Sequence, residues 1–186
     1  MAAGRAGIIL ACLVVLVSAM AEAQNTVKLS GNHPTTIPGK PAGPIDPRRT
    51  LSMSVTLGLR DAQGLQRLLS EQQDPGSPNY RRWLTPQEFA SHFGPDPAQF
   101  NAVRDWLVEQ GFEIESASLQ RRSIQFKGSA ELAERVFETR IESYGGGAYA
   151  NLTDPSIPAR FAGVIAAISG LDNIAHAVPL TNRPKL

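Results

Sequence analysis

The sequence predicts an α+β domain in which an antiparallel sheet carries helices on one face. Three observations lead to this prediction. Residues 51–59 alternate between apolar and polar side chains, later apolar segments change to helical spacing, and Gly, Pro and capping residues separate them. The resulting order is strand, helices, strand, strand, helix, strand, which is the order of the ferredoxin-like split β-α-β fold.

The first predicted strand covers 51–59, and a short helix follows it. Alternation with period two is typical of a half-buried strand, and its apolar members are Leu51, Met53, Val55, Leu57 and Leu59. Asp61 is a suitable N-cap for a helix whose apolar stripe contains Leu65, Leu68 and Leu69. The Pro- and Gly-containing run from Asp74 to Pro78 ends this helix.

Two more helices begin with clear capping sequences. Thr85 to Glu88 forms a capping box with proline at the first helical position, and Leu84 with Phe89 suits a hydrophobic staple. Asp96 and Pro97 start the next helix in the same way. The buried face of that helix is predicted to contain Phe100, Val103 and Leu107, and its C-cap to be Gly111.

The second half of the chain is predicted to contain three strands, at 112–117, 123–127 and 139–144. A helix capped by Ser129 separates the last two. The turn Gly145–Gly147 would let residues 148–152 pair back as a hairpin. A last helix is predicted after Pro158 and before Gly170, because apolar residues recur there at helical spacing. These residues are Phe161, Val164, Ile165 and Ile168.

The N-terminus predicts export. A basic residue precedes the apolar run Ile8–Val17, which is too short to span a bilayer, and Ala21-Glu22-Ala23 is a cleavage motif. Residues 1–23 are therefore predicted to be a signal peptide cut between Ala23 and Gln24. The protein would be secreted or periplasmic, without a stable membrane anchor. The alternatives are a short membrane anchor and a lipoprotein site at Cys12.

The remaining segments outside the domain are predicted to be extended. Residues 24–50 are rich in proline and are predicted to form a linker, extended or disordered. Residues 174–186 are predicted to form an extended tail. Cys12 is the only cysteine and lies in the predicted signal peptide, so the mature chain would have no disulfide and would fold on its apolar core alone.

The sequence predicts no catalytic, cofactor-binding or metal-binding residue. His33, His92 and His176 lack the spacing of metal ligands, and no G-x-S-x-G nucleophile motif occurs. Glu113 and Glu115 share one face of a strand and could form an acid/base pair, but a solvated pair is the more common arrangement.

Nucleic-acid and phosphate binding are also disfavoured. The net charge is only +1, and the basic strand Arg121–Lys127 offers a single aromatic residue for base stacking. Gly145–Gly147 lacks the lysine that follows a phosphate-binding loop, so a hairpin turn is the better interpretation. Asn151-Leu152-Thr153 is a glycosylation sequon, which has meaning only in a eukaryotic host.

Several spaced motifs are similar to those of one family. They are D-P-x-S-P-x-Y at 74–80, W-L-T-P-x-E-F at 83–89, W-L at 106–107, G-F at 111–112 and S-G-L-D-N at 169–173. Together they resemble the pro-domain, or activation domain, of sedolisins, the kumamolisin-like serine-carboxyl peptidases. The resemblance covers 51–173. The residues that carry it are Pro75, Pro78, Tyr80, Trp83, Leu84, Thr85, Phe89, Trp106, Leu107, Gly111, Gly170 and Leu171.

We interpret these motif residues as structural. Tyr80, Trp83, Leu84 and Phe89 are predicted to fix the crossover connection onto the helix layer, and Trp106 with Leu107 to anchor the following helix. The resemblance implies an inhibitor and folding chaperone of a peptidase catalytic domain, acting in cis or in trans. In such a pro-domain a sheet face docks on the peptidase while the tail from Asn173 to Leu186 occupies the substrate groove.

The same resemblance leaves alternatives open. No G-T-S nucleophile block is present, so the chain itself is predicted not to be an enzyme. It would be either a free-standing pro-domain or the front part of a peptidase precursor; an exported domain adapted to another partner is a third possibility. Because members of the family work at acid pH, release of the peptidase is expected to follow protonation of interface carboxylates.

Overall fold

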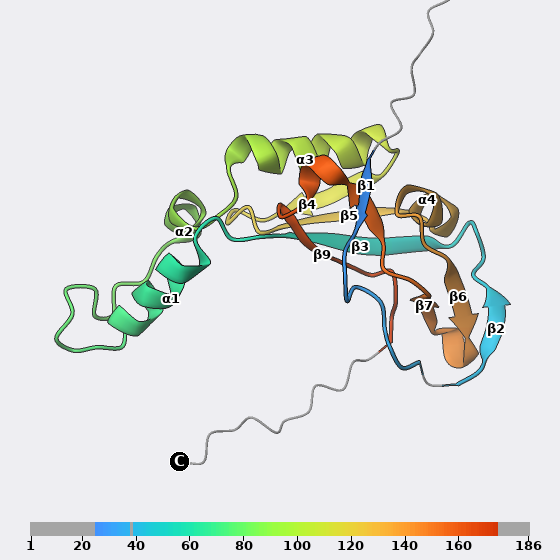
Figure 1. Ribbon diagram of the computed structural model, residues 1–186, viewed down its shortest axis with the longest axis horizontal. Helices are drawn as coiled ribbons and strands as arrows, with labels where there is room; N and C mark the ends of the chain where they lie inside the picture. The colour runs from blue at the N-terminus through green and yellow to red at the C-terminus, as the bar shows by residue number, and fades with distance from the viewer. Residues whose placement is uncertain (1–24, 38, 175–186) are drawn as a thin grey trace, which may run out of the picture.

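The computed structural model describes residues 25–37 and 39–174, and Figure 1 shows the arrangement of their helices and strands. The predicted signal peptide, its cleavage site and the tail from residue 175 lie outside these residues. In chain order the elements are β1 (Thr26–Lys28), β2 (Pro41–Pro44), β3 (Thr50–Leu57), α1 (Ala62–Glu71), α2 (Pro86–His92), α3 (Pro97–Glu109), β4 (Glu113–Ala117), β5 (Ser123–Ser129), α4 (Ala130–Val136), β6 (Ile141–Tyr144), the 3-10 turn η1 (Gly145–Gly147), β7 (Tyr149–Asn151), β8 (Ser156–Pro158), the 3-10 turn η2 (Ala159–Phe161) and β9 (Ile165–Ser169).

A four-stranded sheet in the order β4-β5-β3-β9 is the centre of the fold. Each neighbouring pair is antiparallel. This order and these directions are those of the split β-α-β arrangement, so the predicted α+β, ferredoxin-like fold class is confirmed. Helices α3 and α4 lie on the same side of the sheet (Figure 1).

The core lies between the sheet and these two helices. The alternation predicted for the first strand is confirmed, because Leu51, Met53, Val55 and Leu57 of β3 are all buried. Helix α3 contributes the buried residues Trp106 and Leu107. Aromatic rings fill the centre: the ring centroids of Phe112 and Phe126 are 5.0 Å apart, those of Phe112 and Phe137 are 5.5 Å apart, and those of Trp106 and Phe161 are 5.4 Å apart.

The fourth strand of the sheet differs from the prediction. Residues 139–144 were predicted to complete the sheet and 161–168 to form a helix, but β9 is the edge strand beside β3. A β-bulge explains the error. Thr56 pairs with Ala167 and Leu57 with Ile165, so one extra residue is inserted in β9. Ile165 and Ile168 therefore both face the core although they are three apart, and this imitates helical spacing.

The predicted hairpin at 139–152 forms a second sheet instead. Strands β6 and β7 pair antiparallel around the turn Gly145–Gly147, and β2 adds to the other edge of β6. Gly146 and Gly147 have φ of +72° and +82°, which suits glycine and supports the hairpin interpretation of this triplet.

The segment before residue 51 is also corrected. We predicted an extended or disordered linker at 24–50, but its described part contains two paired strands. Val27 of β1 pairs with Ile157 of β8, and Pro44 of β2 pairs with Glu142 of β6. We call residues 25–37 and 39–45 the N-terminal strap. Its side chains are mostly exposed, so main-chain pairing with distant segments holds it rather than an apolar core of its own.

Helices α1 and α2 form an arm beyond the end of the sheet (Figure 1). None of the residues of α1 is buried. The guanidinium groups of Arg60 and Arg121 donate to carbonyls at the end of α2, and Arg121 also donates to the carbonyl of Pro95 before α3. These bonds tie the arm to the domain. The predicted capping box is present: Thr85 Oγ1 accepts from Glu88 N at 3.2 Å, and Glu88 Oε2 accepts from Thr85 N at 2.7 Å.

Replacing Thr85 with alanine is expected to lower the free energy of unfolding by about 1 kcal/mol, because one N–H of α2 loses its cap. Thr85→Ser keeps the hydroxyl and is the matched control. Urea denaturation of both variants measures the effect. An equal loss in the two variants would show that the methyl group, rather than the cap, is responsible.

Within the described residues, no helix has the length and apolar character that crossing a membrane requires.

Candidate docking face on the open side of the sheet

The face of the sheet opposite α3 and α4 carries polar side chains. On β3 the positions between the buried residues are Ser52, Ser54 and Thr56, and they are exposed or half-buried. Gln125 and Lys127 follow the same alternation on β5. We call this polar side of the β4-β5-β3-β9 sheet the open face. Its position follows from strand period two, because each strand buries one face and leaves the other to solvent.

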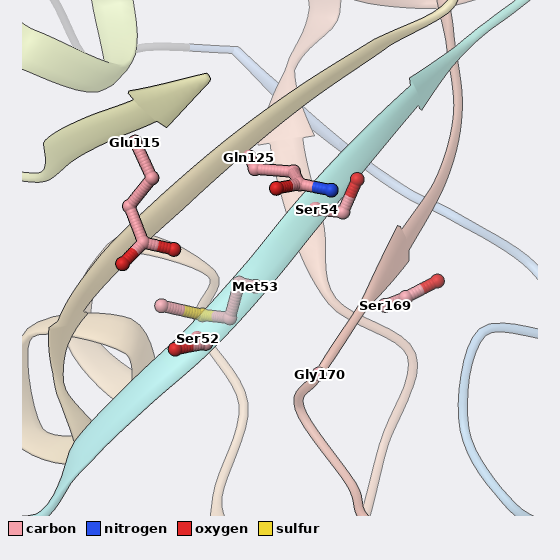
Figure 2. Close-up of a pocket in the computed structure, with 7 residues that line it drawn as sticks. All are labelled: Ser52, Met53, Ser54, Glu115, Gln125, Ser169 and Gly170. Carbon is pink, nitrogen blue, oxygen red and sulfur yellow. The ribbon is translucent and has the colours of Figure 1, made fainter. Parts of the chain in front are cut away.

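A shallow hollow of about 280 Å³ lies on the open face where β9 ends (Figure 2). Four strands contribute to it. Its lining residues are Ser52, Met53, Ser54, Glu115, Gln125, Ser169 and Gly170. Hydroxyl, amide and carboxylate groups are thus available for hydrogen bonds to a surface placed against the sheet.

A β-bulge in β4 directs two carboxylates toward one lysine. Ile114 pairs with Phe126 and Ser116 with Gln125, so Glu115 is the inserted residue. Lys127 Nζ lies 2.9 Å from Glu113 Oε1 and 3.9 Å from Glu115 Oε1. The hydrogen bond to Glu113, with a smaller contribution from Glu115, raises the pKa of Lys127 above its usual value. The two glutamates are therefore partners of a cation, as in a solvated charged cluster.

The geometry of the open face suits a protein surface better than a small molecule. Its hollow is shallow, and serines and a threonine along β3 allow close approach of another backbone. Among the described residues, no group of three or more His, Cys, Asp and Glu side chains could hold a metal ion. His33 contacts Asp154, His92 lies in the arm, and His176 lies outside the described residues.

Gly170 marks the point where the chain leaves the sheet. Its φ is +92°, and a Cβ atom there would lie 2.3 Å from the carbonyl oxygen of Ser52. Leu171 is buried, and Asn173 is fixed to β7 because Tyr149 N donates to its Oδ1 at 2.7 Å. The chain is thus held firmly up to Asn173, immediately before the segment predicted as a tail.

The other motif residues occupy several different environments. Gly111 has φ of +100° after α3, as a C-cap glycine does. Leu84, Phe89 and Tyr80 are half-buried in the arm, and Pro75 and Pro78 are exposed there. Trp83 is 72% exposed, so the prediction that it anchors the crossover in the core is wrong. Its aromatic type, in a motif with the apolar residues Leu84 and Phe89, suggested burial, but the side chain lies largely in solvent.

The burial of Asn151 bears on the glycosylation sequon. Asn151 of the glycosylation sequon is fully buried, and its Nδ2 donates to the carbonyls of Asn32 and Thr153. The side-chain amide of Asn151 is therefore not accessible for glycosylation in the folded chain. Sequence reasoning did not identify Ser52, Ser54 or Ser169 as site residues. The polar half of the predicted strand alternation could have identified the first two.

Comparisons with known proteins give one consistent result. Residues 39–174 match the family model described as "Pro-kumamolisin, activation domain". Sedolisin of Pseudomonas sp. (strain 101) is 30% identical over 134 residues, which are 70% of this chain and 23% of that protein. Xanthomonalisin of Xanthomonas sp. (strain T-22) is 31% identical over 128 residues, 67% of this chain and 16% of that protein. Tripeptidyl-peptidase sed4 of Aspergillus fumigatus is 31% identical over 111 residues, 59% of this chain and 18% of that protein. The chain thus spans less than a quarter of the length of these relatives.

Proposed function

We propose that this chain, which belongs to the pro-kumamolisin activation-domain family of sedolisin-type peptidases, binds a peptidase catalytic domain through the open face of its sheet. Bound there, it assists folding of that domain and blocks its substrate cleft. The chain itself contributes no catalytic group. The observation that carries the proposal is the uncovered polar face, which adjoins the point at which the chain leaves β9.

The physical argument starts from the burial of the sheet. One side of β3 is packed against the helices, whereas Ser52 and Ser54 on the other side have no layer over them among the described residues. A pair of partner helices laid across such small side chains could approach closely and bury a large area. Glu113, Glu115 and Lys127 would then supply charged groups at one border of the interface.

The route of the chain supports the second part of the proposal. Because β9 ends at Ser169 beside the hollow, and Asn173 is fastened to β7, the following residues would start close to the docked surface. An extended segment starting there could enter a substrate groove in the manner of a peptide substrate. Which residues of 174–186 do so is part of the proposal, as is the export expected from residues 1–23.

The test is a titration of the purified chain against a sedolisin-type catalytic domain, with inhibition of peptide hydrolysis as the readout. Ser54→Arg places a long side chain in the middle of the open face and is expected to weaken inhibition at least tenfold, because it would hold a docked surface away from the sheet. Asn101→Arg introduces the same side chain on the exposed surface of α3 and is the matched control.

Both variants should keep the thermal stability of the parent, since Asn101 is exposed and a long side chain at Ser54 can extend from the open face into solvent in the free domain. Equal inhibition by the two variants would exclude the open face as the docking surface. Failure of the unchanged chain to inhibit, both when added in trans and when linked to the catalytic domain, would exclude the function itself.

A second possibility is that docking occurs only within one polypeptide. It is favoured by the relatives, in which the matched region is followed or preceded by a far longer remainder. The chain would then be the activation segment of a precursor, and the inhibition measured in trans would be weaker than in the linked protein.

A further inference from the structure

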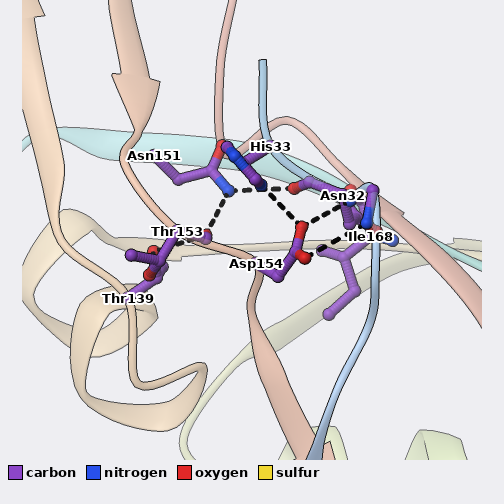
Figure 3. A network of polar contacts seen from close by, with 8 residues as sticks. Asn32, His33, Thr139, Asn151, Thr153, Asp154 and Ile168 are labelled. Carbon is purple, nitrogen blue, oxygen red and sulfur yellow. Dashed lines mark hydrogen bonds and ion pairs between the residues drawn. The ribbon is translucent and has the colours of Figure 1, made fainter. Parts of the chain in front are cut away.

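The N-terminal strap meets the rest of the domain at a cluster of polar contacts between its two strands. Asn32 and His33 lie in the strap, Asn151 and Thr153 lie in and after β7, and Asp154 precedes β8 (Figure 3). Segments far apart in the sequence are joined here by side chains rather than by a strand ladder. Loss of these contacts would therefore loosen the middle of the strap, where Pro34 is also buried.

One carboxylate is the centre of the cluster. Asp154 Oδ1 accepts a hydrogen bond from Asn32 N at 2.7 Å, and Oδ2 accepts one from Gly31 N at 3.1 Å. The ring nitrogen Nδ1 of His33 lies 2.7 Å from Oδ1, which completes an ion pair when the imidazole is protonated. The two side chains are 32% and 19% exposed, so water and protons reach them without unfolding of the core.

Asn32 connects this carboxylate to the edge of the central sheet. Its Oδ1 accepts from Ile168 N at 2.7 Å, and its Nδ2 donates to Ile168 O at 2.6 Å. Its own carbonyl accepts from Asn151 Nδ2 at 2.9 Å. The amide of Asn32 thus takes the place of a neighbouring strand at the outer edge of β9, where main-chain groups would otherwise lack partners.

We propose that Asp154 and His33 form an acid-sensitive latch, which fastens the N-terminal strap over the outer edge of β9 and opens on acidification while the central sheet stays folded. The latch lies within the free domain. It operates whether or not a peptidase is bound, so it does not rest on the docking proposed above.

The direction of the pH effect follows from the bonds at Asp154. The hydrogen bond from His33, followed by those from Gly31 N and Asn32 N, holds the pKa of the Asp154 carboxyl below its usual value. A carboxyl of this kind contributes stability above its unfolded pKa of about 3.9, and the contribution is lost as the pH falls through the lower folded pKa. His33 is the titratable group that faces this carboxyl among the described contacts; Asn32, Asn151 and Thr153 are neutral.

Opening of the latch would change which main-chain groups the domain exposes to solvent. Without Asn32, the N–H and C=O of Ile168 become free on the outer edge of β9, two residues before Gly170. The same strand leads to the segment after Asn173. The pH would therefore change how well β9 is ordered, and β9 is the strand after which the chain leaves the domain.

The test is hydrogen exchange of single amides by NMR in the free chain, with rates corrected for the intrinsic effect of pH. Between pH 7 and pH 3 the protection of the Ile168 amide is expected to fall at least tenfold, whereas the Phe126 amide in β5 keeps its protection. In Asp154→Asn the Ile168 amide is expected to be unprotected already at pH 7. In His33→Gln the loss is expected at a higher pH than in the parent, because the carboxyl loses its charged partner.

Asp96→Asn is the matched control, since Asp96 also accepts a main-chain N–H, at the start of α3, but does not contact the strap. In this variant the protection of the Ile168 amide should depend on pH as it does in the parent. Equal protection of Ile168 at pH 3 and pH 7 would overturn the latch. So would simultaneous loss at Ile168 and Phe126, which indicates global acid unfolding. If Asp154→Asn does not fold by circular dichroism, His33→Gln decides: an unchanged midpoint overturns the proposal, and a raised midpoint supports it.

Discussion

Replacing Phe137 with alanine is expected to lower the free energy of unfolding by about 3 to 5 kcal/mol, one of the largest single-residue effects in this domain. The side chain is fully buried. Its ring stacks on Phe112 at 5.5 Å and meets the rings of Trp106 and Phe126 at 6.2 Å and 6.3 Å. Truncation removes these contacts and leaves a cavity between α4, α3 and the sheet, which the surrounding rings can fill only in part.

Equilibrium urea denaturation measures the loss as a lower midpoint at an unchanged slope. Trp83→Ala is the control, because that larger aromatic side chain is 72% exposed and its removal should alter the free energy of unfolding by no more than about 0.5 kcal/mol. Comparable losses in the two variants would mean that Trp83 is packed in the folded protein and that the arm lies differently from the structure described above.

Replacing Gly170 with alanine is expected to cost more than about 2 kcal/mol for two separate reasons. Its φ of +92° is unfavourable for any residue with a side chain. In addition, the new Cβ would lie 2.3 Å from Ser52 O and 2.9 Å from Met53 Cα, and both atoms belong to the backbone of the central strand. The end of β9 would have to move away from β3.

Gly146→Ala separates the two causes. Gly146 also has a positive φ, of +72°, but nothing lies within 4 Å of its Cβ position, so only the conformational cost of about 1 kcal/mol remains. Thermal denaturation of both variants gives the comparison. If both variants lose the same amount of stability, the close approach of Gly170 to β3 does not contribute to the cost of the Gly170→Ala substitution.

The parts of the fold that local chemistry determines were predictable from the sequence. The alternation in β3, the capping box at Thr85 and the glycine after α3 each depend on residues next to one another in the chain. The family resemblance drawn from the spaced motifs is confirmed by the match to residues 39–174. Capping and alternation predict elements, but they do not say which strands become neighbours.

The errors have physical causes of a different kind. Strand β9 was predicted as a helix because its bulge sets Ile165 and Ile168 on one face, and a bulge depends on the partner strand. Strand β1 was missed because its three residues are exposed and are ordered by pairing with β8 rather than by burial. Trp83 was assigned to the core by its type, whereas its exposure depends on how the arm leaves the sheet.

The candidate site could be predicted in part. Strand alternation gives the polar positions of β3, but it does not show which face of the sheet the helices cover. The placement of Glu115 beside Lys127 depends on the bulge in β4, which the sequence does not reveal. The latch residues could not be identified, because Asn32 and His33 lie in a segment with the composition of a linker.

The topology of the central sheet also sets an order of events during folding. Strand β3 pairs with β9 on one edge, and β1 pairs with β8, so two early strands have partners that are synthesised last. Such a high contact order slows folding relative to helical bundles, since loop closure precedes the contacts that offset it. A nascent chain could pair one edge of β3 once β5 had emerged, but the other edge would stay unpaired until Ser169 had emerged. A chaperone that shields strand edges would therefore increase the folding yield of this domain more than its folded stability.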